Sequence, residues 1–191
     1  MSKQEDIQKI WTLTTTCPVC GKKELIVEDY LYEMPLVGKV LISVSKCKNC
    51  NYKHNDVRAV DSHGPQRISF KVNEPQDLGV LVVRSSSATI KIPDLGIEIT
   101  PGPAAQGFIT TIEGILDRIL DALSVMKNDP EMRERDIKEK EEEILKAKKG
   151  QKRFTLIIED PEGVSRIISE RAEKEALYKQ NTQRRSGIDR R

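Results

Sequence analysis

The sequence predicts an α+β protein in which a four-cysteine zinc ribbon is followed by an antiparallel β domain with an inserted α-helical hairpin. Three observations lead to this fold class. All four cysteines lie in the first third of the 191-residue chain, in two Cys-x-x-Cys pairs. Short runs typical of β-strands occupy much of the remainder. Two longer segments with helical character interrupt these runs between about residues 110 and 150.

The two cysteine pairs, Cys17-Pro-Val-Cys20 and Cys47-Lys-Asn-Cys50, have the spacing of zinc knuckles. Two residues between the sulfurs let the chain turn tightly enough for both thiolates to face one ion. The residue after each knuckle tolerates a left-handed backbone: Gly21 and Asn51. Because cysteine fills all four positions, none remains for a water molecule, and we expect one structural zinc ion (Zn2+). Two disulfides or a redox pair are the alternatives.

Residues 12–60 are predicted to form the ribbon. We expect strands at 24–30 and 39–45, with Pro35 and Gly38 breaking the chain between them. Large side chains flank Pro35 in the expected loop: Tyr30, Tyr32, Met34 and Leu36. They either offer a surface to a partner or pack on the β domain.

Residues 61–175 are predicted to form the β domain. Its expected strands are 67–72, 80–83, 88–92, 96–99, 153–159 and 165–168. The first alternates apolar and polar residues, as a half-buried strand does, whereas 80–83 is continuously apolar and therefore expected to be fully buried. The gap between 99 and 153 holds the helical segments, so the hairpin is predicted to be an insertion at about 110–150.

The first helix is predicted from apolar residues that recur every three or four positions from Ile112 to Met126. Thr110 and Glu113 are expected to form a capping box at its start. Asp129 is expected to cap a second helix that runs to about residue 149. That helix is mostly charged, with a thin apolar stripe: Ile137, Ile144 and Leu145. We therefore expect an antiparallel hairpin whose second helix is largely exposed, either as a solvated strut or as a partner surface.

Charge is nearly balanced overall, with 32 basic and 30 acidic residues. Such a balance gives no general case for binding a polyanion. From Arg171 to the end, however, basic residues dominate, and residues 176–191 are predicted to be a basic, flexible tail. The polar amino terminus lacks a secretory signal, and no apolar run is long enough to span a membrane. We therefore expect a cytoplasmic protein without membrane association; the sequence does not predict its oligomeric state.

No catalytic apparatus is recognisable in the sequence. Neither common glycine-rich phosphate loop occurs, no serine stands in a nucleophile elbow, and the two histidines, His54 and His63, leave little for general base catalysis. Acidic pairs lie on the charged helix, where lysines explain them. We therefore expect a binding protein rather than an enzyme.

The chain resembles the ZPR zinc-finger domain family from about Cys17 to Ile168. The matching motifs are Cys17-Pro-Val-Cys20-Gly, Cys47-Lys-Asn-Cys50-Asn-Tyr52-Lys-His-Asn55-Asp-Val57, Asp77-Leu, Val82-Val-Arg-Ser85, Ile90-Lys-Ile-Pro93-Asp-Leu95, Ile97-Glu98-Ile, Gly107-Phe-Ile-Thr110-Thr111-Ile-Glu113-Gly114, and Phe154-Thr-Leu through Asp160-Pro161-Glu-Gly163. The chain departs from the family at Asn51, where glycine is usual, and at Val164, where asparagine is usual. It also carries one zinc-plus-β module, as in the archaeal form, where eukaryotic members have two in tandem.

The resemblance implies a zinc ribbon joined to a double-stranded β-helix-like domain with a helical hairpin. It also implies a chaperone-like protein that binds translation elongation factor 1-alpha. The first hypothesis for function is therefore an adaptor or folding chaperone for that factor. The alternative is a nucleic-acid-binding ribbon of the transcription or translation machinery, supported by lysines near the knuckles: Lys22, Lys23, Lys46, Lys48 and Lys53. A third hypothesis, an enzyme with a site in the β domain, requires a cleft with convergent carboxylates.

Overall fold

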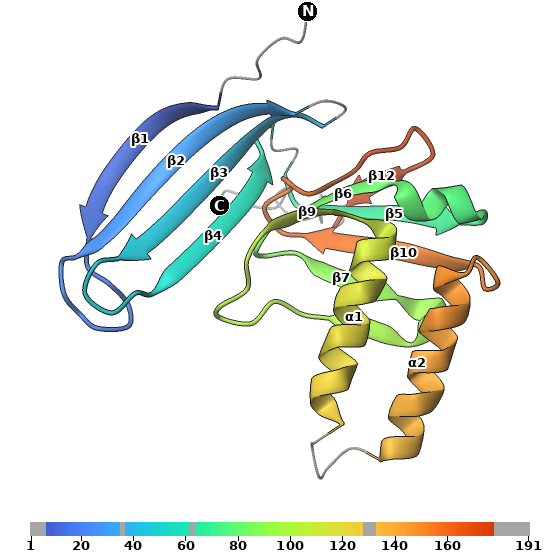
Figure 1. Ribbon diagram of the computed structural model, residues 1–191. Coiled ribbons are helices and arrows are strands. Elements are labelled where there is room, and N and C mark those ends of the chain that lie inside the picture. The colour runs from blue at the N-terminus through green and yellow to red at the C-terminus, as the bar shows by residue number, and fades with distance from the viewer. Residues whose placement is uncertain (1–6, 35–36, 62–63, 128–132, 178–191) are drawn as a thin grey trace, which may run out of the picture.

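The computed structural model describes residues 7–34, 37–61, 64–127 and 133–177. They form a ribbon sheet, drawn in blue and cyan, and a larger β domain from which a helical hairpin projects (Figure 1). Within the described residues, no helix is both long and apolar enough to cross a membrane. The strands pair antiparallel in both parts, so the predicted α+β class with a ribbon, a β domain and a helical hairpin is confirmed.

The ribbon is a four-stranded sheet whose strands lie in chain order. The strands are β1 (Gln8–Thr15), β2 (Leu25–Met34), β3 (Gly38–Cys47) and β4 (Lys53–Ala59). The two predicted strands are the central pair, and both are longer than predicted. The two outer strands were not predicted. β4 is mostly polar and lacks an apolar face, whereas β1 alternates apolar and polar residues only over 11–14 and is exposed along almost its whole length.

The β domain consists of two antiparallel sheets. The five-stranded sheet has the order β12-β5-β10-β7-β8, and the three-stranded sheet has the order β11-β6-β9. The bounds are β5 (Gln66–Val72), β6 (Leu81–Arg84), β7 (Thr89–Ile92), β8 (Ile97–Ile99), β9 (Phe108–Thr111), β10 (Phe154–Asp160), β11 (Arg166–Ile167) and β12 (Glu173–Ala176). Two short 3₁₀ helices, η1 (Pro75–Gly79) and η2 (Pro93–Leu95), connect strands. The six predicted strands are present, whereas β9 and β12 were missed.

The core of the β domain lies between the sheets and the first helix. Side chains from three strands and that helix are almost completely buried there: Ile68, Phe70, Ile90, Leu156, Ile158, Ile112 and Leu116. Burying a large aliphatic side chain contributes roughly 1.5–3 kcal/mol relative to leaving it exposed. Of the run at 80–83, which was predicted to be fully buried, Val82 and Val83 have no exposed surface, whereas Val80 and Leu81 are only partly buried because they lie just before and at the start of β6.

Helix α1 spans Ile112–Met126, and its start differs from the predicted capping box. Thr110 lies in β9, and the cap is the next residue, Thr111, whose side-chain oxygen accepts a hydrogen bond from the Gly114 N–H at 3.1 Å. The strand therefore continues directly into the helix. The apolar periodicity was interpreted correctly, because the first two turns bury the predicted face against the core.

Helix α2 spans Glu134–Lys148, and the predicted cap Asp129 lies outside the described residues. Arg133 occupies the N-cap position without a side-chain capping bond. Ile137 and Ile144 are buried as predicted, but Leu145 is 45% exposed and Ala147 completes the buried stripe instead. The reason is geometric: Ala147 lies three positions after Ile144, on the same helix face, whereas Leu145 is rotated by about 100° from it.

The flexible tail predicted at residues 176–191 begins too early, because Ala176 belongs to β12 and the Leu177 N–H donates a hydrogen bond to the Pro65 carbonyl at 3.0 Å. β12 pairs with β5 in a ladder from Glu173↔Ser69 to Ala176↔Gln66. All four residues of β12 are exposed and three are charged, so the strand has no apolar signal in the sequence. The remainder of the predicted tail lies outside the described residues.

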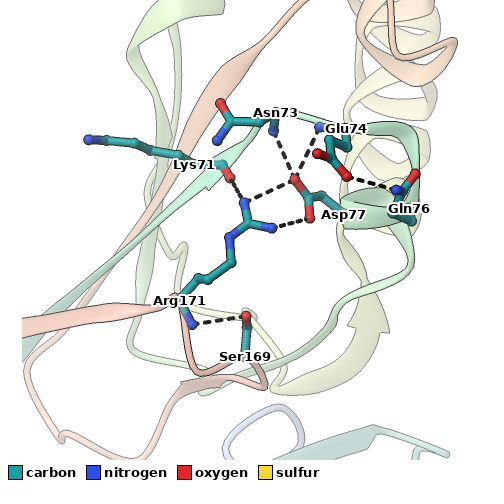
Figure 2. A network of polar contacts seen from close by, with 7 residues as sticks. All are labelled: Lys71, Asn73, Glu74, Gln76, Asp77, Ser169 and Arg171. Carbon is teal, nitrogen blue, oxygen red and sulfur yellow. Dashed lines mark hydrogen bonds and ion pairs between the residues drawn. The ribbon is translucent and has the colours of Figure 1, made fainter.

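A clasp between Arg171 and Asp77 fixes this C-terminal strand to the domain (Figure 2). The guanidinium donates two hydrogen bonds to the carboxylate, at 2.7 and 3.1 Å, and a third to the Lys71 carbonyl at 2.8 Å. The Asp77 carboxylate also accepts hydrogen bonds from the backbone N–H groups of Asn73 and Glu74. Both carboxylate oxygens are therefore satisfied in a side chain that is only 6% exposed.

The clasp makes stability depend on pH. The Arg171 guanidinium, with smaller contributions from the two backbone N–H groups, lowers the pKa of Asp77 to about 2. The pKa of an aspartate in an unfolded chain is about 3.9. The clasp therefore contributes its full stabilisation above that pH, and this contribution is lost as the pH falls through the folded pKa of about 2. We expect Arg171→Ala to lower the free energy of unfolding near neutral pH, because the buried Asp77 carboxylate then loses both hydrogen bonds from the guanidinium.

Urea unfolding of the wild type and Arg171→Ala, near neutral pH and near pH 2.5, measures this effect. The difference in unfolding free energy between the two proteins should shrink in acid. Other carboxylates that titrate in the same range affect both proteins alike, so this change reports on Asp77. Arg153→Ala is a matched control, because Arg153 is an exposed arginine at the start of β10. An Arg171→Ala penalty of the same size at both pH values would contradict the role of the clasp.

Candidate metal centre and ribbon surface

The two knuckles bring all four predicted ligands together at one end of the ribbon. The four Sγ atoms, of Cys17, Cys20, Cys47 and Cys50, all lie within 4.8 Å of one another. Two of the sulfur pairs are 3.7 Å apart, and each joins one knuckle to the other: Cys17 with Cys50, and Cys20 with Cys47. A tetrahedral zinc with Zn–S bonds of about 2.3 Å requires sulfurs about 3.8 Å apart. The spacing therefore fits a zinc ion.

Each knuckle is shaped by its own backbone hydrogen bonds. In the first, the Cys17 N–H donates to the Lys22 carbonyl at 2.8 Å, and the Gly21 N–H donates back to the Cys17 carbonyl at 2.9 Å. The second repeats both bonds, from the Cys47 N–H to the Tyr52 carbonyl and from the Asn51 N–H to the Cys47 carbonyl. Both turns contain a left-handed residue, with φ of 70° at Gly21 and 58° at Asn51. Asparagine thus fulfils the role in which glycine is usual.

The electrostatics of the cluster favour a cation. A hydrogen bond from the Lys22 backbone N–H lowers the pKa of Cys20 to about 6. The Tyr52 N–H acts in the same direction on Cys50, but desolvation and the neighbouring thiols outweigh it and raise the pKa of Cys50 to about 12. Four thiolates packed this closely repel one another, and a divalent cation at their centre removes that conflict.

The metal centre has the features of a structural zinc site rather than a catalytic one. With four thiolates in a tetrahedron, no coordination position is left for water or substrate, which a catalytic zinc requires. Cys17 and Cys47 are buried, and Leu25, Val27 and Tyr52 pack against the cluster. His54 is half-buried on β4 and does not belong to the cluster, as expected; His63 lies outside the described residues. The site fits the single structural zinc that the sequence predicted.

The lysines of the alternative hypothesis surround the metal centre. All five are exposed: Lys22, Lys23, Lys46, Lys48 and Lys53. Lys46 and Lys53 lie opposite each other on β3 and β4, and the Lys22 ammonium donates a hydrogen bond to the Asn49 side chain at 2.8 Å. The knuckle end of the ribbon is therefore positively charged.

The ribbon also carries an apolar strip on its outer strand, which the sequence analysis missed. We name the side chains Ile7, Ile10, Trp11 and Leu13 the β1 strip. They are 58%, 48%, 49% and 43% exposed, respectively. Ile7 directly precedes β1, Ile10 lies at a shift in the β1–β2 register, and Trp11 and Leu13 share one face of the sheet. β1 forms the edge of the sheet, so its outer backbone groups are unpaired within the described residues. The signal was present as the alternation Trp11-Thr-Leu13-Thr, followed by the turn that leads into the first knuckle.

Three of the large side chains that were expected to flank Pro35 in a loop lie in a strand instead. Tyr30, Tyr32 and Met34 belong to β2 and are half-buried, and the Tyr30 hydroxyl donates a hydrogen bond to Glu28 at 2.9 Å. β2 runs further than predicted because its ladder with β3 continues to Met34↔Gly38. Pro35 and Leu36 lie outside the described residues.

A carboxylate of the ribbon joins it to the β domain. Asp56, on β4, accepts hydrogen bonds through one oxygen from the backbone N–H groups of Val57, Ser86 and Gly107, at 3.0, 3.3 and 3.1 Å. Two of these three donors belong to the β domain. The Ala59 N–H adds a backbone bond to the Val164 carbonyl at 3.1 Å. We name these contacts between the ribbon and the β domain the joint.

The turn after β10 supports the β-domain side of the joint. The buried Asp160 carboxylate accepts hydrogen bonds from the backbone N–H groups of Glu162, Val164 and Ser165, at 2.9, 3.0 and 2.6 Å. The valine at position 164 contributes through its backbone, so the turn forms without the usual asparagine. Several motifs that carried the resemblance therefore meet at this joint, although they lie far apart in the sequence.

Two family models match the two parts of the chain. A model described as the ZPR1 zinc-finger domain matches residues 9–63. A model described as the ZPR1 jelly-roll domain matches residues 76–187. The first includes the four cysteines and all four ribbon strands from Lys9 onward, and the second covers the β domain from η1.

Similar proteins occur in archaea and in eukaryotes. A ZPR1-like protein of Methanocaldococcus jannaschii is 37% identical over 183 residues, which are 94% of this chain and 90% of that protein. A ZPR1-like protein of Pyrococcus horikoshii is 36% identical, over 96% of this chain and 84% of that protein. The zinc finger chaperone zpr1 of Schizosaccharomyces pombe is 30% identical over 82% of this chain, which corresponds to 35% of the longer yeast protein.

Proposed function

Because this chain belongs to the ZPR1 zinc-finger family, we propose that it is a zinc-stabilised protein-interaction module that serves as an adaptor or folding chaperone for translation elongation factor 1-alpha. The name of the fission-yeast relative, zinc finger chaperone, supports the chaperone role. The partner follows from the family resemblance of the motifs. The proposal assigns no catalytic activity, and it places the protein in the cytoplasm, where reducing conditions keep thiols available to zinc.

The β1 strip is the observation that carries the proposal. Exposed apolar side chains such as Trp11 and Leu13, which share one face of β1, form the kind of surface that partner proteins bind. The open edge of β1 can also accept an added strand from a partner, which is a recurrent mode of protein recognition. The zinc centre lies where β1 ends and β2 begins, so metal binding holds the strip in place.

We expect Trp11→Ala to weaken binding of elongation factor 1-alpha roughly 30-fold, equivalent to about 2 kcal/mol, because a half-exposed tryptophan on an edge strand has the properties of an interface hot spot. The measurement is an affinity pull-down with the zinc-loaded chain and the nuclease-treated factor, followed by calorimetric titration of the purified pair. The variant should retain its zinc, since Trp11 does not contact the cluster.

Leu145→Ala is the matched control, because Leu145 is an equally exposed apolar residue on the distant helix α2. It should bind as the wild type does. Loss of binding in Leu145→Ala but not in Trp11→Ala would move the interface to the helical hairpin. Failure to detect the factor in either assay would refute the proposed partner.

The lysines at the knuckle end support a second candidate, a nucleic-acid-binding ribbon. Ribbon sheets that bind single strands usually present stacked aromatic side chains, whereas the described surface around these lysines offers only the half-buried Tyr52. RNA binding that falls steeply as salt rises, and that is lost in Lys46→Glu, would favour this candidate. Binding of the elongation factor that resists nuclease would favour the first.

A further inference from the structure

A cavity of about 660 Å³ opens between helix α1 and the β7–β8 hairpin, away from the ribbon and the metal centre. Figure 1 shows α1 passing in front of β7. Its volume is within the range of about 300–1,000 Å³ that is usual for ligand sites. The proposed binding surface on the ribbon includes none of the residues that line this cavity.

The wall of the cavity is mainly apolar. Its side chains come from β8 and from one face of α1: Ile97, Ile99, Ile119, Ala122, Leu123 and Met126. Ile97, Ile99 and Leu123 pack against the main core and are only partly buried, so the cavity is an open extension of that core. The apolar surface continues to the exposed end of α1, where Met126 is 38% exposed.

One side of the cavity carries two guanidinium groups around a single aromatic ring. The Arg118 guanidinium lies 4.3 Å from the centre of the Phe108 ring, and that of Arg84 lies 5.6 Å from it. Arg84 is buried and donates its hydrogen bonds to the carbonyls of Ala88 and Gln106. The nearby carboxylates of Asp56 and Asp160 partly compensate its charge, so Arg84 is a fixed structural part of the wall.

Arg118 is exposed at the cavity, and among the residues that the structure describes no carboxylate forms an ion pair with it. The glutamate that lines the cavity, Glu98, is paired with Lys91 at 3.4 Å. The remaining lysine, Lys140, is bonded to Glu143 and to the Leu95 carbonyl. Among the described residues that line the cavity, the positive charge without a carboxylate partner is therefore that of Arg118.

We propose that this cavity binds a segment of a client protein in which a bulky apolar side chain stands beside a carboxylate. The apolar wall accepts the side chain, and Arg118 pairs with the carboxylate at the partly desolvated rim, where an ion pair is stronger than in bulk water. A protein segment is favoured over a small molecule because the apolar surface extends past the cavity onto the open end of α1. This inference rests on the proposed protein-binding function and assigns it a second contact surface.

A pair of dyes tests the chemistry of the cavity without any client. Anilinonaphthalene sulfonate combines an apolar ring system with a negative charge, and phenylnaphthylamine is the same ring system without the charge. We expect Arg118→Ala to weaken binding of the sulfonate roughly fivefold and to change that of the neutral dye less than about twofold. Ala122→Trp, which fills the cavity from the helix surface, should abolish binding of both dyes there.

Arg135→Ala is the matched control, because Arg135 is an exposed arginine on α2 that does not line the cavity. Far-ultraviolet circular dichroism shows whether each variant is folded. Sulfonate binding that is insensitive to both Arg118→Ala and Ala122→Trp overturns the proposal, since the cavity is then not the site that binds the apolar anion.

A competition experiment identifies the occupant. The displacing probes are a capped dodecapeptide with phenylalanine and leucine beside glutamates, its counterpart with lysine in place of each glutamate, and octanoate. Displacement of the sulfonate by the acidic peptide but not by the basic one supports the proposal. Displacement by octanoate alone assigns the cavity to a small carboxylate and overturns it. A failed elongation-factor pull-down with a positive peptide result would refute the proposed partner and leave this site standing.

Discussion

Replacing Cys47 with serine is expected to unfold the ribbon and leave the jelly-roll domain folded. Cys47 is completely buried and pairs through sulfur with the opposite knuckle, so its loss leaves three thiolates and an incomplete tetrahedron. In structural zinc sites the apparent metal-binding free energy of about 10–16 kcal/mol is largely folding free energy. The jelly-roll domain has a separate core that contains none of the cysteines, and it should survive.

Zinc content by atomic absorption and the fluorescence of Trp11, the single tryptophan of the chain, measure this outcome. The variant should lose its zinc and the folded Trp11 signal together, and chelation of the wild type should have the same effect. His54→Ser, which alters a neighbouring residue outside the cluster, should keep one zinc per chain. A Cys47→Ser protein with unchanged zinc content and unchanged melting would disprove the structural role of the metal.

Replacing Gly107 with alanine is expected to break the joint between the ribbon and the jelly-roll domain. A Cβ atom at this position would lie 2.6 Å from both the nitrogen and the carbonyl oxygen of Val57, and it would also collide with the Asp56 carboxylate. These neighbours are backbone or anchored by hydrogen bonds, so they cannot yield without releasing the bonds that Asp56 accepts. We expect a loss of about 2–4 kcal/mol, since hydrogen bonds to a charged group contribute about 1.5–3 kcal/mol each.

Scanning calorimetry measures this loss, and it should also show the ribbon and the jelly-roll domain melting in separate transitions. Gly102→Ala is the matched control in the same connection, because a Cβ there would have no neighbour within 4 Å. It should change the melting temperature little. A Gly107→Ala protein that melts in one transition at the wild-type temperature would show that the joint contributes nothing to stability.

The features that the sequence predicted are those set by local patterns. The knuckles follow from the spacing of cysteines two residues apart, and helix α1 follows from a repeat that one face of a helix must bury. The central strands of both sheets have one or two buried faces, so their apolar residues show the period of a strand. The family motifs added the chain-wide architecture, which no local pattern contains.

The features that were missed depend on partners distant in the sequence. β12 is exposed and charged, and what makes it a strand is the edge of β5 about 100 residues earlier. Asp56 has the appearance of an ordinary polar residue until the fold brings the amides of Ser86 and Gly107 to it. The clasp of Arg171 with Asp77 spans 94 residues. Hydropathy patterns predict which face of a helix or strand is buried, but they do not predict pairings between residues distant in the sequence.

The order of strands in the five-stranded sheet also limits which parts of the protein can fold during its synthesis. The ribbon is closed by contacts among residues 8–59 alone, so it can take up zinc while the chain is still leaving the ribosome. β5 is synthesised next, but its sheet partners β10 and β12 begin only at Phe154 and Glu173, near the end of the described part of the chain. Such distant pairing slows folding and leaves strand edges open meanwhile. A nascent chain that stops before Phe154 therefore consists of a complete ribbon followed by an incomplete sheet, in which β5 has neither of its partner strands.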